Sequence, residues 1–166
     1  LIAVVKVGYN EVTAPLVRYE ATALASVADA LAEHAHTPSL LGAARIGTLE
    51  AMAMRPLPAI DGNRAVKEEG LVVLVRNISD SGDQPRDDLS SLLEHTRMQT
   101  LASVATAIDE ALADTPVGAI HGDFHRGNLG VAQDGRPVVW DWERWADGIP
   151  RGFDLLHYTL QTWVHG

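Results

Sequence analysis

The chain has 166 residues, of which 46% are apolar and 21% charged, a composition typical of globular domains that excludes disordered, collagen-like and low-complexity proteins. Its 13 basic and 22 acidic residues give a net charge of -9, which argues against a nucleic acid partner because a phosphate backbone is bound by positive charge. The absence of cysteine excludes disulfides and cysteine-bound zinc, and no apolar run reaches the roughly 18 residues that cross a bilayer. We expect a cytoplasmic protein without membrane partners, whose acidic surface tolerates a cationic small molecule; the sequence predicts no oligomeric state.

The amino-terminal part of the chain is predicted to hold three strands and one helix. The β-branched run Leu1–Val7 indicates a strand, and because the chain starts inside it we expect a piece of a longer protein. Apolar residues at three- and four-residue spacing predict a helix over residues 15–34. Residues 40–54 predict two short strands divided near Gly47, and Arg55–Pro58 predicts an extended connector because its prolines disfavour a helix.

The middle of the chain gives a mixed pattern. Leu71–Val75 fits either a strand or a buried helix, and periodicity alone does not decide between them. The polar run from Ser79 to Pro85 predicts a loop. After it, Asp87 and Asp88 can cap a long helix that runs to about Ala113.

A β-hairpin is predicted in the last third, because Asp134-Gly135 lies between the apolar runs Leu129–Ala132 and Pro137–Trp140. With a two-residue turn, Asn128 would face Asp141 across the ladder, with their Cβ atoms roughly 4.5 to 5.5 Å apart. A carboxylate and an amide oxygen are ligands that suit Mg²⁺. The spacing therefore predicts a magnesium site at the open end of the hairpin.

Asp123 precedes this hairpin in a loop that contains Gly122 and Gly127, where the backbone can bend sharply. A carboxylate beside a metal ion can orient a hydroxyl group and accept its proton during phosphoryl transfer. The loop therefore predicts a base close to the magnesium site.

The two polar segments carry a family resemblance. His-Gly-Asp-Phe-His-Arg-Gly-Asn at 121–128 and Trp-Asp-Trp-Glu at 140–143 resemble the catalytic loop and metal-binding segment of the aminoglycoside phosphotransferase and choline kinase group of small-molecule kinases. The resemblance implies an α+β, protein-kinase-like, two-lobed fold. It also implies that Asp123 is the catalytic base and that Asn128 and Asp141 bind Mg²⁺.

Other stretches follow the order of the same family. Lys6 resembles the lysine that contacts the ATP phosphates, and Glu20 on the next helix resembles its ion-pair partner. Met52, Ala53 and Met54 resemble the hinge whose backbone receives adenine. The implied reaction transfers the γ-phosphoryl group of ATP to a hydroxyl of a small molecule such as an aminoglycoside, choline or a sugar.

The resemblance also predicts how the chain divides. Residues 1–56 would be part of a β-rich amino-terminal lobe with the hinge near residues 52–56, and residues 57–166 part of a helical lobe. The strands and loop that cover the ATP phosphates would precede Lys6, and the family continues past residue 166, so the domain is expected to be truncated at both ends. The resemblance therefore predicts kinase activity for the whole domain and makes no prediction for the 166-residue piece alone.

Two other functions stay open. The first is a nucleotide-binding module of the same fold that lacks turnover, because the phosphate-covering loop is missing. The second is a metal-dependent phosphohydrolase that uses His121, Asp123 and His125 with Mn²⁺ or Zn²⁺. Against it, we expect both histidines to be hydrogen-bonded parts of the loop.

Several other polar and aromatic residues have simpler expected roles. Asp154 precedes an apolar run and is expected to cap a helix. Trp140 and Trp163 are expected in the core, whereas Trp142 and Trp145 lie among charged residues and are candidates to line a site. Glu143, two residues after Asp141, leaves the number of metal ions open between one and two.

Overall fold

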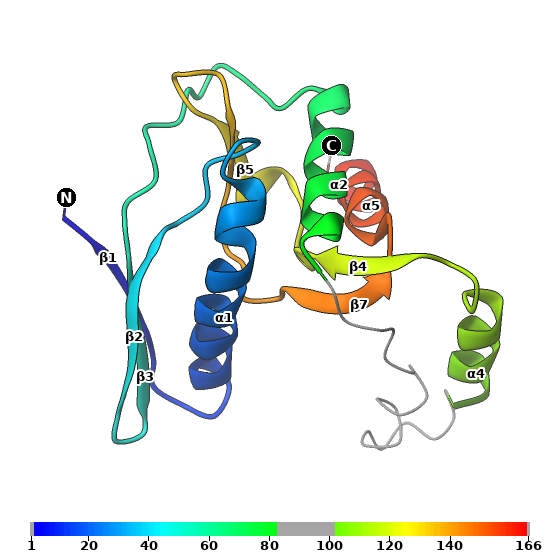
Figure 1. Cartoon of the computed structure of the whole chain (residues 1–166), viewed down its shortest axis with the longest axis horizontal. Helices are drawn as coiled ribbons and strands as arrows, with labels where there is room; N and C mark the ends of the chain where they lie inside the picture. The colour runs from blue at the N-terminus through cyan, green and yellow to red at the C-terminus, as the bar shows by residue number, and fades with distance from the viewer. Residues whose placement is uncertain (1, 83–101, 166) are drawn as a thin grey trace.

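The computed structural model describes residues 2–82 and 102–165, which Figure 1 shows as a sheet at one side, helix α1 beside it, and the remaining helices and strands beyond α1. The first sheet has three antiparallel strands in the order β1-β3-β2. They are β1 (Val4–Gly8), β2 (Leu40–Ile46) and β3 (Leu49–Met54). The predicted division of residues 40–54 is confirmed, since Gly47 makes the turn between β2 and β3 with a positive φ of 64°.

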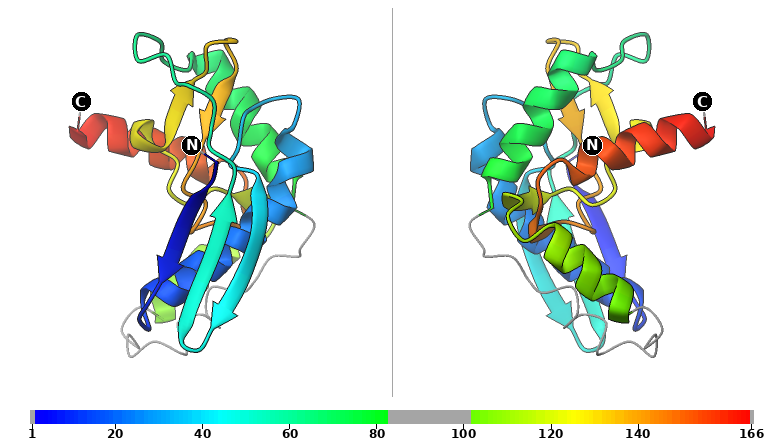
Figure 2. Two further views of the ribbon diagram at one scale, coloured as in Figure 1. Left: turned by 90° about the vertical axis from the view of Figure 1, so that its left-hand side faces the viewer. Right: turned by 90° about the vertical axis from the view of Figure 1, so that its right-hand side faces the viewer.

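Helix α1 (Thr13–Leu31) covers one face of this sheet (Figure 2). The helix predicted over residues 15–34 is confirmed, although it starts two residues earlier and ends three residues sooner. Asn10 fixes its start, because the Oδ1 atom of this residue accepts hydrogen bonds from the backbone N–H groups of Val12 and Thr13. The buried face of α1 includes one charged residue, Glu20, among apolar neighbours.

The ambiguous run around Leu71–Val75 belongs to helix α2 (Glu68–Asp80). Its buried apolar residues recur every three or four positions, at Leu71, Leu74, Val75 and Ile78, which is the spacing of one helical face. Helix α4 (Ala102–Ala111) lies within the range of the long helix predicted to run to about Ala113. The expected cap residues Asp87 and Asp88 lie outside the described residues.

A second, two-stranded sheet was not predicted. It pairs β4 (Val117–Ile120) with β7 (Ala146–Pro150) in antiparallel orientation, and helix α5 (Phe153–His165) follows. These strands frame the polar segments at 121–128 and 140–143, because one strand leads into the first segment and the other leaves the second. The sheet therefore fixes both ends of the predicted site region.

The predicted hairpin is present as β5 (Leu129–Val131) and β6 (Pro137–Val139), but its register differs by one residue from the prediction. Ala132 and Arg136 close a three-residue loop, in which Gly135 has a φ of 90°. A glycine in this conformation is typical of three-residue hairpin loops, and the longer loop shifts the pairing. As a result Asn128 lies opposite Trp140 and not opposite Asp141. The backbone N–H of Trp140 donates to the Asn128 carbonyl at 3.3 Å.

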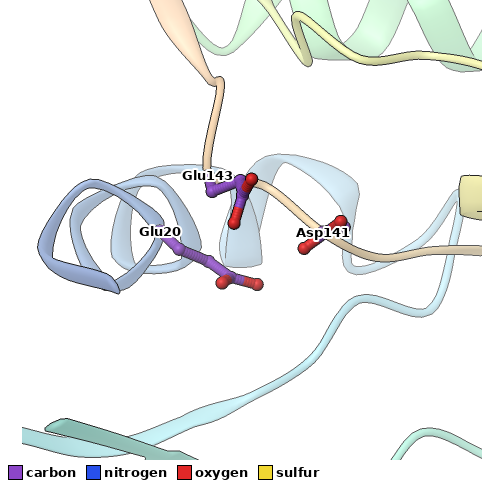
Figure 3. A group of neighbouring side chains, drawn as sticks. All are labelled: Glu20, Asp141 and Glu143. Atoms are coloured by element: carbon purple, nitrogen blue, oxygen red, sulfur yellow. The ribbon is translucent and has the colours of Figure 1, made fainter. Parts of the chain in front are cut away.

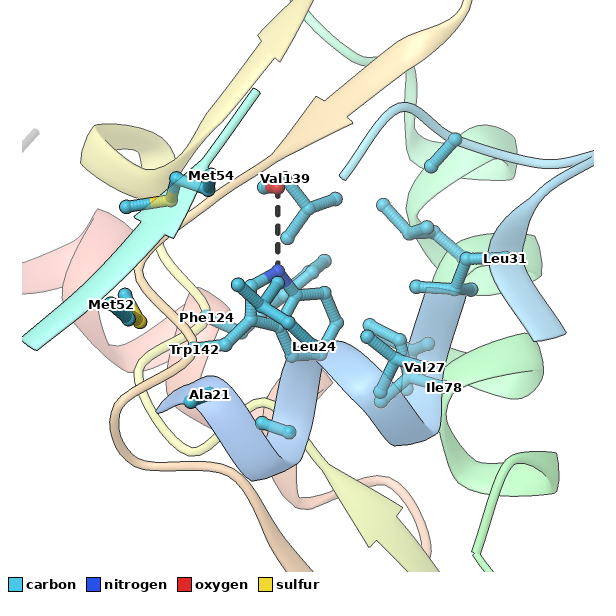
Figure 4. Close-up of a cluster of buried hydrophobic side chains, with 14 of the residues drawn as sticks. Ala21, Leu24, Val27, Leu31, Met52, Met54, Ile78, Phe124, Val139 and Trp142 are labelled. Atoms are coloured by element: carbon cyan, nitrogen blue, oxygen red, sulfur yellow. Dashed lines mark hydrogen bonds between the residues drawn. The ribbon is translucent and has the colours of Figure 1, made fainter. Parts of the chain in front are cut away.

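One apolar core extends from the first sheet to α5 (Figure 4). Residues from both sides of the predicted lobe boundary contribute to it, including Leu24 of α1, Met52 of β3, Ile78 of α2 and Phe124 of the loop. At its centre lies Trp142, which is fully buried and donates from Nε1 to the Val139 carbonyl at 3.4 Å.

Two expectations for the tryptophans are therefore wrong. Trp142 belongs to the core although charged residues flank it, because Asp141 and Glu143 lie on the other side of the same segment. Trp163, by contrast, is 83% exposed on α5. Among the described residues, no helix combines the length and the apolar character needed to cross a membrane.

Candidate active site

Lys6 lies at the centre of the candidate site. It is in the middle of β1, opposite Met52 of the neighbouring strand, and its side chain extends toward α1. Its Nζ atom lies 2.6 Å from Oε2 of Glu20, whose side chain is only 1% exposed. The structure thus brings together the two residues that the sequence suggested as an ion pair.

The same ammonium group also contacts Asp141. Lys6 Nζ donates to Asp141 Oδ1 at 2.7 Å, which joins the first sheet to the segment that follows β6. Asp141 has a φ of 68°, in the left-handed region that residues other than glycine seldom adopt. Such backbone strain persists where the surrounding contacts hold it, and here the contact with Lys6 is one of them.

Burial and charge act against each other on this pair. Burial alone would lower the pKa of Lys6, but its bonds to Asp141 and Glu20 outweigh that effect and raise it. The pKa of Glu20 is raised, chiefly by burial and also by the carboxylates of Asp141 and Glu143, although Lys6 opposes this. The ammonium group therefore stays charged, while burial holds the pKa of the Glu20 carboxyl group above its usual value although Lys6 acts to lower it.

Asp123 lies in the loop between β4 and the short 3₁₀ helix η2 (Arg126–Asn128). Asn128 Nδ2 donates to the Asp123 carbonyl at 3.0 Å and to Asp123 Oδ2 at 3.2 Å, and His125 Nε2 lies 3.6 Å from the same Oδ2. These contacts hold the Asp123 carboxylate in place, and its side chain is 31% exposed and so accessible to solvent. Asn128 itself is buried. Both of its hydrogen bonds to Asp123 use the Nδ2 atom, and neither uses Oδ1.

Asp154 holds this loop through two hydrogen bonds to its backbone. It lies in the first turn of α5, and its carboxylate accepts hydrogen bonds from the backbone N–H groups of His121 at 2.7 Å and Gly122 at 3.0 Å. The prediction that Asp154 caps its own helix is therefore wrong. The signal was missed because the partners lie 33 and 32 positions earlier in the sequence. Burial raises the pKa of the Asp154 carboxyl group, while the two backbone N–H groups act to lower it.

His121 is completely buried and uses both ring nitrogens within the protein. Nδ1 accepts from the Asp123 N–H at 3.2 Å, and Nε2 donates to the Trp140 carbonyl at 3.0 Å. The ring also lies against Trp142, with the ring centroids 4.5 Å apart. Burial lowers the pKa of His121 to about 4, so the ring is neutral at pH 7 and joins the loop to the hairpin.

The expectation that both histidines are structural is confirmed. His125 Nδ1 accepts from the Gly127 N–H at 2.9 Å and thereby caps η2. Because both nitrogens of His121 are already hydrogen-bonded, this residue cannot ligate a metal ion without breaking the loop. This removes one of the three ligands required by the phosphohydrolase hypothesis.

The predicted hinge residues lie within a strand. Met52 and Ala53 pair with β1 on one side and β2 on the other, and Met54 ends both ladders. In a central strand the backbone N–H and C=O groups are used by the neighbouring strands, so Met52 and Ala53 have none to offer to adenine. The first backbone free of the sheet begins after Met54, in the connector that starts at Arg55.

Three carboxylates, two of them bound to Lys6, lie close together (Figure 3). Ligand atoms of Glu20, Asp141 and Glu143 lie within 4.8 Å of one another. Asn128, the second predicted metal ligand, instead contacts Asp123. The site thus combines a partly exposed carboxylate on a hydrogen-bonded loop with a lysine that joins two acidic residues from distant parts of the chain.

Comparisons with known proteins agree on the fold. A search of curated proteins gave no significant match. Among solved structures, LicA in complex with AMP matches with a TM-score of 0.61 at 13% identity, over 96% of this chain and 61% of that one. The GDP and kanamycin complex of APH(2")-IIIa matches with a TM-score of 0.56 at 15% identity, over 96% and 66%.

A third structure, a putative fructosamine-3-kinase from Haemophilus somnus 129PT, matches with a TM-score of 0.54 at 12% identity, over 95% of this chain and 68% of that one. The chain thus spans about two thirds of the length of these proteins and shares the mixed helix and strand fold of small-molecule kinases. The model of the phosphotransferase enzyme family matches residues 13–165. The chain therefore belongs to the phosphotransferase enzyme family.

Proposed function

We propose that this chain forms the catalytic part of a kinase that transfers the γ-phosphoryl group of ATP to a hydroxyl group of a small molecule. The observation that carries the proposal is the contact of Lys6 with both Glu20 and Asp141. A lysine fixed by a buried glutamate is a suitable partner for nucleotide phosphates, and Asp141 lies beside it as a metal ligand. The matched family and the AMP and GDP complexes of similar structures support a nucleotide substrate.

In this proposal Asp123 is the catalytic base. Its carboxylate accepts the proton of the acceptor hydroxyl and orients that oxygen, while Asn128 and His125 hold the carboxylate in position. Asp154 and His121 act as positioning residues, because they fix the backbone around Asp123. Holding the acceptor in line with the phosphoryl group is the principal contribution of such a loop.

Asn128 and Asp141 are the proposed Mg²⁺ ligands. The donor set fits, because Asn128 uses its Nδ2 atom toward Asp123 and so keeps its amide oxygen for a cation, and carboxylate oxygen is the other ligand Mg²⁺ prefers. When bound, Mg²⁺ would neutralise charge on the nucleotide phosphates. The adenine ring of the nucleotide would lie where the chain leaves β3, at Met54 and the connector after it.

A cavity of about 680 Å³ is the proposed acceptor site. It lies between the start of α2, the strand β5 and α5, and Arg126 at its edge follows Asp123 by three residues. Its charged lining residues are Arg64, Arg126 and Glu68, so arginine outnumbers glutamate. The local charge favours a neutral or anionic acceptor over the cationic one that the net charge of the chain suggested.

Thermal unfolding with ATP or ADP, with and without Mg²⁺, tests the proposal. A nucleotide at 100 times its dissociation constant should stabilise the chain by about 2.7 kcal/mol. Asp141→Asn should abolish the Mg²⁺-dependent part, whereas Asp114→Asn, a change of an exposed carboxylate in the loop after α4, should not. Stabilisation that is absent, or equal in both variants, would refute the proposed nucleotide site.

A radiolabelled ATP assay with a panel of hydroxyl acceptors separates the kinase from a nucleotide-binding module without turnover. Asp123→Asn should bind nucleotide like the wild type and transfer no phosphoryl group. If the wild type binds nucleotide and transfers to no acceptor, the binding-module hypothesis replaces the kinase.

A further inference from the structure

We propose that Glu20, Asp141 and Glu143 form a binding site for one divalent cation that fills without any nucleotide. This site is distinct from the Asn128–Asp141 pair assigned above to the nucleotide-bound Mg²⁺, although Asp141 belongs to both. Its ligand atoms come from α1 and from the segment after β6, and they lie within 4.8 Å of one another. Figure 3 shows the three carboxylates pointing into one common space.

One carboxylate oxygen of Glu20 has no hydrogen-bond partner, which indicates that a ligand binds there. Glu20 is 1% exposed, and its Oε1 atom has no hydrogen-bond partner. A buried, unpaired carboxylate oxygen is costly, because the protein does not replace the water it has lost. Lys6 satisfies only Oε2 of Glu20 and Oδ1 of Asp141, which leaves the second oxygen of each carboxylate for another cation.

The charge of the cluster agrees with this. The cluster holds three carboxylates, and Lys6 forms ion pairs with only two of them, Glu20 and Asp141. In the described part of the chain no basic side chain forms an ion pair with Glu143. A divalent cation would balance the two excess negative charges.

The ligand chemistry identifies the class of ion. All three side chains offer hard carboxylate oxygens, and no sulfur or imidazole ligand belongs to the cluster. Such a set suits Mg²⁺, Mn²⁺ or Ca²⁺, with water completing the coordination. Since Glu20 is fixed on α1 and Asp141 on the segment after β6, the bound ion would join these two parts before the nucleotide arrives.

Electron paramagnetic resonance of Mn²⁺, titrated into the nucleotide-free chain, tests the proposal directly. The wild type should bind one Mn²⁺ per chain in this cluster. Glu143→Gln should weaken this binding by at least tenfold, whereas Glu110→Gln, which removes an exposed carboxylate on α4, should leave it unchanged. Asn128→Ser should also leave it unchanged, because Asn128 serves only the nucleotide-bound ion.

Two further results separate a cation site from an acidic patch. Without metal, Glu143→Gln should melt at the same temperature as the wild type or higher, because repulsion with Glu20 is removed. Lys6→Met should tighten Mn²⁺ binding, because it removes the competing ammonium group. Both readouts are independent of activity and of nucleotide.

The proposal is overturned if nucleotide-free Mn²⁺ binding is absent, or if Glu143→Gln and Glu110→Gln bind Mn²⁺ equally. Binding that occurs only when ADP is added, and is lost in Asn128→Ser, would overturn this proposal while leaving the proposed kinase function intact.

Discussion

The Asp154 carboxylate lies 2.7 Å from the backbone nitrogen of His121, a residue 33 positions earlier in the chain. The same carboxylate receives the Gly122 N–H, so one side chain of α5 holds two consecutive peptide groups of the loop that carries Asp123. Helix α5 therefore acts as a support for the candidate base.

Replacing Asp154 should destabilise the protein and loosen the loop. Asp154→Ala leaves two N–H groups without an acceptor at a site where Asp154 is 1% exposed, which costs roughly 1 to 3 kcal/mol for each group. Asp154→Asn keeps one acceptor oxygen and should lose less. Urea unfolding measures the difference, and amide hydrogen exchange of His121 and Gly122 should accelerate in both variants. Unchanged exchange in Asp154→Ala would contradict this role.

Removing the ammonium of Lys6 should leave Glu20 as an uncompensated buried charge. Lys6→Met should lower the free energy of unfolding by roughly 1 to 3 kcal/mol. We expect no larger loss, because the Lys6 side chain is 34% exposed and water already weakens the ion pair. Adding Glu20→Gln to this variant should recover part of the loss, since the buried group is then neutral. A double-mutant cycle measures the coupling, and a coupling energy near zero would mean that the ion pair does not stabilise the fold.

Two glycines with similar backbone angles should differ in their tolerance of alanine. Gly122 has a φ of 81°, and a Cβ atom there would collide with the carbonyl of Arg144. Gly152 has a φ of 91° but faces open space. Gly152→Ala should cost about 1 to 2 kcal/mol, the strain of the left-handed region alone, and Gly122→Ala should cost clearly more. Equal losses in thermal unfolding would show that the packing around Gly122 adapts.

The buried His121 should make the protein sensitive to acid. Its pKa falls to about 4 in the fold, against about 6.5 when unfolded, so the unfolded chain binds more protons between these values. The stabilisation of the fold that comes from keeping His121 neutral is complete above pH 6.5. As the pH falls toward 4, this stabilisation is lost, by up to about 3 kcal/mol. The raised pKa of Asp154 has the opposite sign, so the comparison between variants isolates the histidine.

Denaturant unfolding between pH 7 and pH 4 measures this effect. His121→Asn should be less stable at pH 7 and lose less stability toward pH 4, whereas His34→Gln, a change at an exposed histidine, should follow the wild type. If the slopes of all three proteins agree, another group causes the acid sensitivity.

Local patterns predicted most of the elements. The helix α1, the two strands of residues 40–54 and the hairpin were all anticipated, because apolar spacing and turn glycines act between neighbours in the sequence. The register of the hairpin was missed by one residue, because Gly135 closes a three-residue loop and not a two-residue turn. The strands β4 and β7 were missed because each contains glycine or proline and is short.

The sequence by itself determined the chemical identity of the site residues: a polar loop with Asp123, a second segment with Asp141, and a lysine in a strand near the start. The tertiary structure decided which of them meet. Lys6 and Asp141 lie 135 positions apart, and their contact depends on how α1 packs between the sheet and the segment after β6. The same packing buries Trp142, exposes Trp163 and turns Asp154 toward the loop. These outcomes depend on long-range burial and hydrogen bonding, and spacing along the chain carries no information about them.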